Sequence, residues 1–393
     1  MRSSRFILLL MLAALSLLAA GKHPITVLDA ARGNPPDSPP PIWRPDGRAF
    51  LYEEGGRVYL YDLADRKAKE WFQLHDVNAH QAPAANSPQH PFQWQNRRVD
   101  TSKLQWFPDG KAVLVPQQDN LSIVDAGQSR ARESLPGLNE SNVPTLSPDG
   151  RSILFRRDSN LFVFDLSSKK TVPLTVDGTA TLLNGQLDWV YPEELDLGTA
   201  FWWAPDSKQI AFFQFDVSRE QIFPHADLLG LRAIYEPQRY PQAGTPNAQV
   251  RVGVVSAAGG KVTWLKTGDT ATTLLARACW IDPHTLAIQR LTRVQDRLQL
   301  LFADTQSGDV RTILEERSDT WINLADDFRF LPSKNQFVWS SERDGYRHLY
   351  LFSAAGQLIR RLTSGPWQVN GVTAIDAAAG FVYYTGTQIS PLE

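Results

Sequence analysis

The chain has 393 residues, of which 42% are hydrophobic, and this is enough to build a large core from several sheets or two domains. Its formal net charge of −2 leaves no basic footprint for nucleic acid, so no nucleic-acid partner is expected. A single cysteine, Cys279, excludes a disulfide framework and a cysteine zinc cluster. We expect it to be a small buried residue beside Trp280, with an intermolecular bridge as the alternative.

The first residues have the pattern of a targeting segment. Arg2 and Arg5 precede an uncharged, mostly apolar run from Phe6 to Ala20, and Gly21 follows as a small residue for cleavage. The pattern predicts a signal peptide over residues 1–20 and export to the periplasm or outside the cell. A retained signal anchor is the alternative, although the run is short for a bilayer span of about 20 residues. A proline-rich lead-in is predicted over residues 21–41.

A phrase then recurs from residue 42 onward. WRPDGRAFLYEEGGRVYLYDL is one copy and LSPDGRSILFRRDSNLFVFDL is another: a bulky apolar residue, a turn, and two strands of alternating polarity. The copies begin at Trp43, Trp106, Leu146, Trp203, Trp280 and Phe330. Irregular spacing with several strands per copy predicts the blades of an all-β propeller over residues 42–393. The last copy, Ala374 to Thr387, is only half a unit, which predicts an incomplete last blade.

Two long segments interrupt the copies. Residues 78–98 are polar and contain prolines, so they are predicted to form a loop between early blades. Phe215 to Gln249 is a long insertion within one blade, and insertions of this length are usually functional or disordered. We expect this insertion to be functional because it closely follows the most unusual segment of the chain.

That segment is LDWVYPEELDLGTAFWWAPDSKQIAFFQFD, which places Glu193 and Glu194 side by side among aromatic residues. Adjacent like charges in an apolar setting are costly unless a cation pairs with them. A solvated surface turn is one interpretation. The other is a trap for a primary ammonium, whose three donors suit two carboxylates. In that case a rigid wall around the acids is expected from Trp189, Tyr191, Phe201, Trp202 and Trp203.

The same segment resembles the signature of the dipeptidyl peptidase IV family of prolyl oligopeptidase-type serine peptidases. RYPQAGTPNAQVRVGVV, SSERDGYRHLYLF and LTSGPWQVNGV also resemble family stretches, in the family's order. The resemblance implies an eight-bladed propeller with a C-terminal α/β-hydrolase domain, and often a homodimer. It also implies that Glu193 and Glu194 hold the amine of a peptide substrate with a free N-terminus. Release of Xaa-Pro or Xaa-Ala dipeptides would follow from counting two residues from that end.

Two departures from the family pattern stand out. The stretch from Leu114 to Asp125 lacks the early-blade arginine that mammalian relatives use for substrate carbonyls, and Arg156 and Arg157 are weak substitutes. No Gly-x-Ser-x-Gly elbow is present, and the chain offers no counterpart of the Ser-Asp-His triad. No catalytic residue is therefore assigned, and the chain alone is expected to be inactive, with the hydrolase domain absent.

The remaining residues predict neither a cofactor nor a metal site. The seven histidines show no metal-binding spacing, and His348 is expected to serve packing or hydrogen bonding. Two hypotheses about function stay open. In the first, the chain is the substrate-gating and N-terminus-anchoring propeller of an exported dipeptidyl peptidase, truncated before its catalytic domain. In the second, it is a non-catalytic propeller that binds peptides or protein partners.

Export is directly testable. Cleavage near Gly21 should remove the basic segment with its two arginines and deliver the mature chain to the periplasm or outside. Mass spectrometry of the N-terminus of the protein recovered from each cell fraction measures this. A cytoplasmic protein that still begins at Met1 would contradict the prediction.

Overall fold

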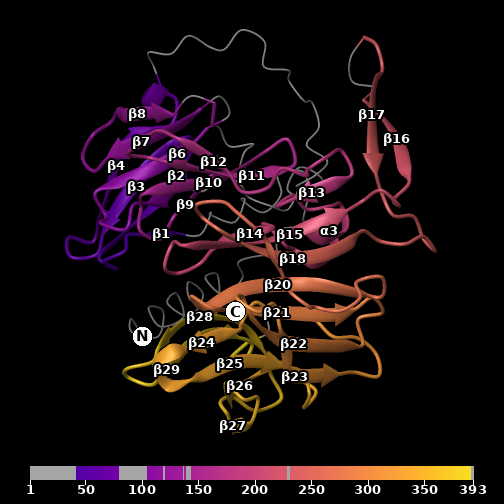
Figure 1. Cartoon of the computed structure of the whole chain (residues 1–393). Helices are drawn as coiled ribbons and strands as arrows, with labels where there is room; N and C mark the ends of the chain where they lie inside the picture. Colours follow the sequence, from indigo (N-terminus) through magenta and orange to yellow (C-terminus); the bar gives the residue numbers. More distant parts are fainter. Residues whose placement is uncertain are drawn as a thin grey trace, which may run out of the picture.

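The computed structural model describes residues 41–78, 104–117, 120–135, 137–138, 143–227 and 231–390. The predicted signal peptide lies outside these residues, as does most of the proline-rich lead-in and of the predicted loop at 78–98. Within them, the chain forms seven consecutive antiparallel sheets and one separate hairpin, which confirms the all-β propeller. We number the sheets as blades 1 to 7 in chain order. Blades 1 to 4 fill the upper part of Figure 1, and blades 5 to 7 the lower part.

The first three blades each have four strands that are neighbours in chain order. Blade 1 consists of β1 (Ile42–Trp43), β2 (Ala49–Glu54), β3 (Arg57–Asp62) and β4 (Lys67–Gln73), and a short 3-10 turn, η1 (Asp76–Asn78), follows it. Blade 2 consists of β5 (Gln105–Trp106), β6 (Ala112–Pro116), β7 (Leu121–Asp125) and β8 (Ala131–Leu135). Blade 3 consists of β9 (Thr145–Leu146), β10 (Ser152–Arg157), β11 (Asn160–Asp165) and β12 (Thr171–Pro173).

Blades 5 and 6 follow the same four-stranded plan, and blade 7 has two strands in the described residues. Blade 5 consists of β20 (Thr273–Asp282), β21 (Thr285–Thr292), β22 (Arg297–Asp304) and β23 (Val310–Arg317). Blade 6 consists of β24 (Arg329–Leu331), β25 (Gln336–Ser341), β26 (His348–Ser353) and β27 (Leu358–Arg361), with a 3-10 turn, η4 (Pro332–Lys334), after β24. Blade 7 consists of β28 (Val369–Asp376) and β29 (Phe381–Gly386).

The recurring turns take the conformation that their sequence predicts. In the Pro-Asp-Gly copies, Gly47, Gly110 and Gly150 have φ of 68°, 68° and 71°, a region that glycine enters without steric cost. The fourth copy has Ser207 at this position with φ 61°. Its hydroxyl accepts a hydrogen bond of 3.0 Å from the Asp149 amide in the turn of blade 3. The serine therefore joins two neighbouring blades at a position where glycine would join none.

Alternation along each strand divides the core between neighbouring blades. In β6, Val113 and Val115 pack with blade 1, whereas Leu114 packs with blade 3. In β10, Leu154 packs toward blade 4 and Phe155 toward blade 2. Successive side chains of a strand point to opposite faces, so the inner blades 2 and 3 each bury both of their faces against neighbouring blades.

Blade 4 carries two insertions. Its central strand is β15 (Gln209–Asp216), which pairs with β18 (Gln249–Ser256) on one edge, and β19 (Thr263–Trp264) pairs with β18. On the other edge β13 (Leu182–Asn184) and β14 (Phe201–Trp203) pair with different parts of β15. A six-residue helix, α3 (Val190–Leu195), lies between these two short strands.

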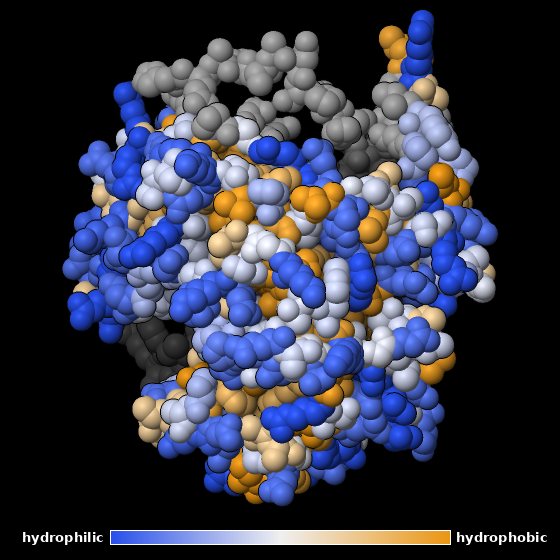
Figure 2. Space-filling model, in the orientation of Figure 1, coloured by the Kyte–Doolittle hydropathy of each residue, from blue (hydrophilic) through white to orange (hydrophobic). Residues whose placement is uncertain are grey.

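The insertion is shorter at both ends than the predicted range from Phe215 to Gln249. Phe215 and Asp216 belong to β15 and Gln249 begins β18, because both ends continue the alternation of blade 4. The insertion itself includes a hairpin of β16 (Ile222–Asp227) and β17 (Ile234–Arg239), which projects beyond blade 4 in Figure 1. Ile222 and Phe223 are exposed, and hydrophobic colour is visible on the projecting hairpin in Figure 2.

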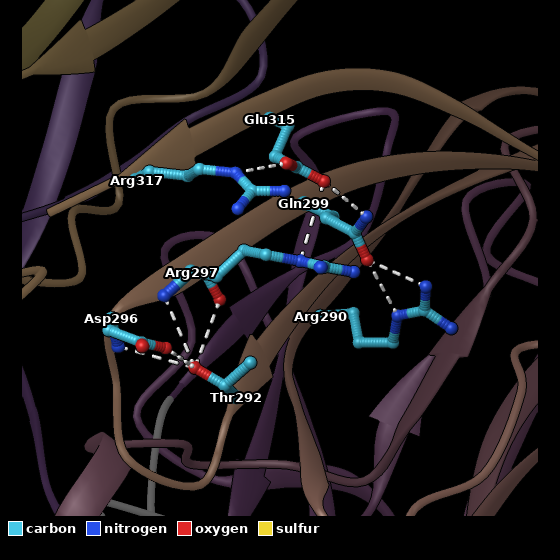
Figure 3. Close-up of polar contacts among 7 residues, drawn as sticks. All are labelled: Arg290, Thr292, Asp296, Arg297, Gln299, Glu315 and Arg317. Carbon is cyan, nitrogen blue, oxygen red and sulfur yellow. Dashed lines mark hydrogen bonds and ion pairs between the residues drawn. The ribbon is translucent and has the colours of Figure 1, made fainter.

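A polar ladder crosses three strands of blade 5 (Figure 3). At its centre the Gln299 carbonyl oxygen accepts hydrogen bonds from Arg290 Nε and Nη2, at 3.0 and 2.6 Å. The Gln299 amide donates to Glu315 Oε2 at 2.7 Å, and Arg317 Nε donates to Glu315 Oε1 at 2.7 Å. Gln299 is only 7% exposed, and its side chain bridges the Arg290 cation and the Glu315 anion through buried hydrogen bonds.

Replacing Gln299 by alanine should destabilise the protein. The change leaves Arg290 and Glu315 without their shared partner, so we expect the free energy of unfolding to fall by about 1–3 kcal/mol. Urea unfolding followed by tryptophan fluorescence measures the change. Gln306→Ala, at an exposed position of the turn after β22, is the matched control and should leave the midpoint in place. Equal midpoints for both variants would contradict the bridging role.

Candidate functional site

Helix α3 begins at a buried carboxylate. Asp188 Oδ1 accepts a hydrogen bond of 3.0 Å from the Tyr191 amide, which satisfies one of the free N–H groups of the first turn. Pro192 is also in the first turn, where its lack of an N–H costs little. The helix ends at Asp196, which has a left-handed φ of 50° and whose backbone N–H donates a hydrogen bond to the Tyr191 carbonyl. Sequence and geometry thus agree on a single short helical segment.

One face of α3 is fixed to blade 5. Tyr191 is 1% exposed, and its ring meets Phe215 edge-on at a centroid distance of 4.8 Å. Its hydroxyl oxygen accepts a hydrogen bond of 3.0 Å from the Leu275 amide of β20. Burial raises the pKa of this phenol, so it remains a neutral hydroxyl. Leu195, one turn later on the same face, is buried in the same core cluster.

The carboxyl end of α3 is held by Arg277 of β20. Arg277 Nη1 donates to the Leu195 carbonyl at 2.6 Å, and Nε donates to Asp326 Oδ1. A cation at this end satisfies an open carbonyl and opposes the negative end of the helix dipole. Blade 5 therefore holds the helix by two hydrogen bonds, one from the Leu275 amide and one from the Arg277 side chain.

Glu193 and Glu194 occupy the remaining face of the helix. Glu193 is half-buried and Glu194 is exposed, while Tyr191, Pro192 and Leu195 turn inward. The two carboxylates thus stand on the outer side of a helix whose inner side cannot shift without breaking the contacts to blade 5. Charged acceptors held in this way suit a ligand that carries several N–H donors.

The aromatic residues around the pair divide into two groups. Trp189 meets Tyr240 edge-on at 4.5 Å, and Trp189, Tyr191 and Trp202 pack with the core cluster of α3. Phe201 and Trp203 lie instead in the cluster between blades 3 and 4. This follows from the strand: in β14, Phe201 and Trp203 share one face and Trp202 takes the other. The five aromatics therefore do not form one wall.

Other residues singled out in the sequence have structural surroundings. His348 is fully buried, with Nδ1 3.0 Å from Thr363 Oγ1 and Nε2 3.0 Å from the Gly365 carbonyl, which confirms its predicted packing and hydrogen-bonding role. Arg157 donates to the Gly137 carbonyl, and burial lowers the pKa of Arg156. The expectation that Cys279 is buried is wrong: its side chain is exposed, on the opposite side of β20 from the buried Ala278.

Two features of this region escaped the sequence reasoning. Arg277 lies far along the chain in the following blade, and no local pattern links it to α3. The second is a buried carboxyl pair, Asp188 and Glu220, at the start of the helix and at the root of the hairpin. Asp188 was part of the quoted motif, but its burial has no sequence signal. Within the described ranges no group of three or more histidine, cysteine, aspartate or glutamate side chains is placed to hold a metal ion.

Fold and site together define a β-propeller with a paired-carboxylate helix on blade 4. The family model described as "Dipeptidyl peptidase IV (DPP IV) N-terminal region" matches residues 107–393, and these include α3. The chain therefore belongs to the dipeptidyl peptidase IV family and comprises the N-terminal region characteristic of it.

Similar proteins agree with this assignment. The chain is 31% identical over 260 residues to a probable dipeptidyl peptidase 4 of Aspergillus clavatus, covering 62% of this chain and 34% of that protein. It is 28% identical over 277 residues to dipeptidyl aminopeptidase B of Saccharomyces cerevisiae, covering 65% and 34%. Its fold is similar to the crystal structure of Porphyromonas gingivalis dipeptidyl peptidase 4, with a TM-score of 0.73 at 23% identity, covering 89% and 50%.

The chain spans about a third of the length of these curated relatives and half of the solved structure. Among the residues that the structure describes, no helix is both long enough and apolar enough to cross a membrane.

The anchoring of α3 predicts a specific cost for a small change. Tyr191→Phe keeps the ring but leaves the buried Leu275 amide without an acceptor, so the free energy of unfolding should fall by about 1–3 kcal/mol. Chemical denaturation measures the loss. Tyr346→Phe removes the same atom from an exposed tyrosine and serves as the control. If the two variants were equally stable, the hydroxyl would not anchor the helix.

Proposed function

We propose that this chain is the substrate-anchoring propeller of an exported serine dipeptidyl peptidase, with Glu193 and Glu194 holding the free N-terminus of a peptide. One observation carries the proposal: two adjacent carboxylates stand on the outer face of a helix that blade 5 fixes through Leu275 and Arg277. A fixed pair needs little reorganisation when a ligand arrives, so more of the interaction energy appears as affinity.

The chemistry of an N-terminal amine fits this pair. An ammonium has three donors and a positive charge, and two carboxylates can accept two of those donors in charge-assisted hydrogen bonds. Recognition of the chain end would limit the depth to which a peptide enters, which is how an enzyme can release dipeptides. Trp189 and Tyr191 support this by holding the start of the helix rather than by touching the ligand.

The proposal includes a partner that performs the chemistry. A serine peptidase needs a nucleophile, a general base and an acid that orients the base, and the proposal assigns these to an α/β-hydrolase domain that would meet the propeller. The propeller would then gate and orient the substrate while the hydrolase cleaves it. A homodimer of the complete enzyme remains a prediction that rests on the family alone.

Binding of a free amine by the chain tests the proposal. We expect alanyl-prolinamide to bind, and N-acetyl-alanyl-prolinamide, which lacks the ammonium, not to bind. Glu193→Gln and Glu194→Gln should each weaken binding by roughly ten- to a hundredfold, because each removes a charge-assisted contact of about 1.5–3 kcal/mol. Ligand-observed NMR titration gives the affinities.

The controls separate charge at the site from charge in general. Glu54→Gln removes an exposed glutamate of blade 1 and should bind the amide as the unchanged chain does. If both helix variants bind the free amine as well as the unchanged chain, the glutamate pair is a solvated turn. If the acetylated peptide binds equally well, the site does not recognise a chain end.

A further inference from the structure

A second pair of carboxyl groups lies beneath the glutamate helix. Asp188 and Glu220 are 7% and 3% exposed, which is rare for acids whose carboxyl groups form no ion pair with the described residues. Each uses one oxygen: Asp188 Oδ1 accepts from the Tyr191 amide at 3.0 Å, and Glu220 Oε1 accepts from the Ala248 amide at 3.1 Å. The other oxygens, Asp188 Oδ2 and Glu220 Oε2, are buried and accept no hydrogen bond from the described residues.

The pair joins the two insertions of blade 4. Asp188 immediately precedes the first turn of α3, and Glu220 lies where the chain leaves β15 for the β16–β17 hairpin. At the same root, Arg239 Nη1 donates to the Glu220 carbonyl at 2.8 Å. Tyr240, the next residue, packs edge-on against Trp189. The two acids therefore lie at the bases of the two insertions, and each influences the ionisation of the other.

The surroundings of Asp188 and Glu220 favour the protonated form of both carboxyl groups. Burial, and after it the nearby charge of Glu220, raises the pKa of Asp188 to about 8. Burial also raises the pKa of Glu220 to about 7, against the lowering effects of the Ala248 amide, of Arg239 and of Asp188. Apart from the two acids, the titratable groups that act on this site are Arg239 of β17 and Tyr191 of α3. Because Arg239 favours the charged form of Glu220, the proton belongs on Asp188.

We propose that Asp188 and Glu220 share one proton, donated by Asp188 Oδ2 to Glu220 Oε2, and that this acid pair positions α3. This would give both orphan oxygens a partner and leave one charge rather than two in the buried site. Asp188 and Glu220 are positioning residues: they act on the site through the first turn of the helix. Their effect on amine binding rests on the function proposed for Glu193 and Glu194, whereas the shared proton does not.

The direction of the pH effect follows from the raised pKa values. In an unfolded or locally open chain both acids ionise near their ordinary pKa of about 4, so the closed form binds an extra proton above that pH. The stabilisation is complete below pH 4 and is lost as the pH rises through 7 to 8. Loss of one proton on opening makes local opening about tenfold easier for each pH unit in this range.

Hydrogen exchange of the full chain tests the shared proton directly. The readout is the protection of the peptide spanning residues 187–197, which includes the Tyr191 amide, after correction for the intrinsic rate at each pH. In the unchanged chain protection should fall by about tenfold per unit between pH 6 and 8. Asp188→Asn supplies an amide donor to Glu220 at every pH, so its protection should not depend on pH. Asp188→Ala should be poorly protected throughout.

Two further variants keep the test decisive. Glu220→Gln, which can donate to an ionised Asp188, should also remove the pH dependence, and it replaces the asparagine variant if that one does not fold. Asp269→Asn changes an exposed aspartate by the same atoms and should keep the slope of the unchanged chain. A flat profile in the unchanged chain, or the full slope retained in Asp188→Asn or Glu220→Gln, overturns the shared proton.

Amine binding then shows whether the pair positions the site. The ratio of alanyl-prolinamide affinities, Asp188→Asn over the unchanged chain, cancels the ionisation of the ligand itself and should rise between pH 6 and 8. A constant ratio overturns the positioning role. If the exchange results hold but no variant binds the amine at any pH, the acid pair stands and the function proposed for Glu193 and Glu194 fails.

Discussion

The structure depends on the burial of both faces of every inner blade. The side chains of each inner strand alternate between two faces, and both faces pack against apolar side chains. Blades 2 to 6 of the described chain therefore depend on their neighbouring blades to shield both faces from water. Edge strands and turns carry the polar residues instead. Insertions can therefore enter only in the connections between strands: α3 lies between the edge strands β13 and β14 of blade 4, and the β16–β17 hairpin lies between β15 and β18.

Placing α3 at such an edge explains its unusual set of contacts. A six-residue helix has little stability of its own, because nucleation is costly and few internal hydrogen bonds form. Its conformation is imposed from outside by the Asp188 carboxyl, the Leu275 amide and the Arg277 guanidinium. All three are fixed by blades that have large cores. Two acidic side chains can then face outward with little freedom of the backbone beneath them.

The sequence predicted the parts of the fold that local physics determines. Turns with Pro-Asp-Gly and the two alternating strands after them appear in the structure where the repeats place them. The fourth strands were missed. β27 (Leu358–Arg361) is exposed at every position and β12 is largely exposed, so an outer strand shows no alternation to read.

The candidate site shows the same division. The motif around Glu193 and Glu194 was visible in the sequence, and the structure places the two glutamates on the short helix α3. Its supports were not visible, because Arg277 and Glu220 come from other parts of the chain and are brought to α3 only by tertiary packing. The aromatic wall failed for a simpler reason: Phe201 and Trp203 belong to a strand, so their faces alternate.

The interrupted edge of blade 4 has an evolutionary consequence. β13 and β14 return to the same side of β15, so the segment between them leaves the sheet and rejoins it at adjacent sites. Changes of length or composition in this segment need not disturb the pairing of β15 with β18. The blade thus acts as a frame that tolerates exchange of its excursion, and a related propeller could lose or replace the acidic helix while its architecture persisted.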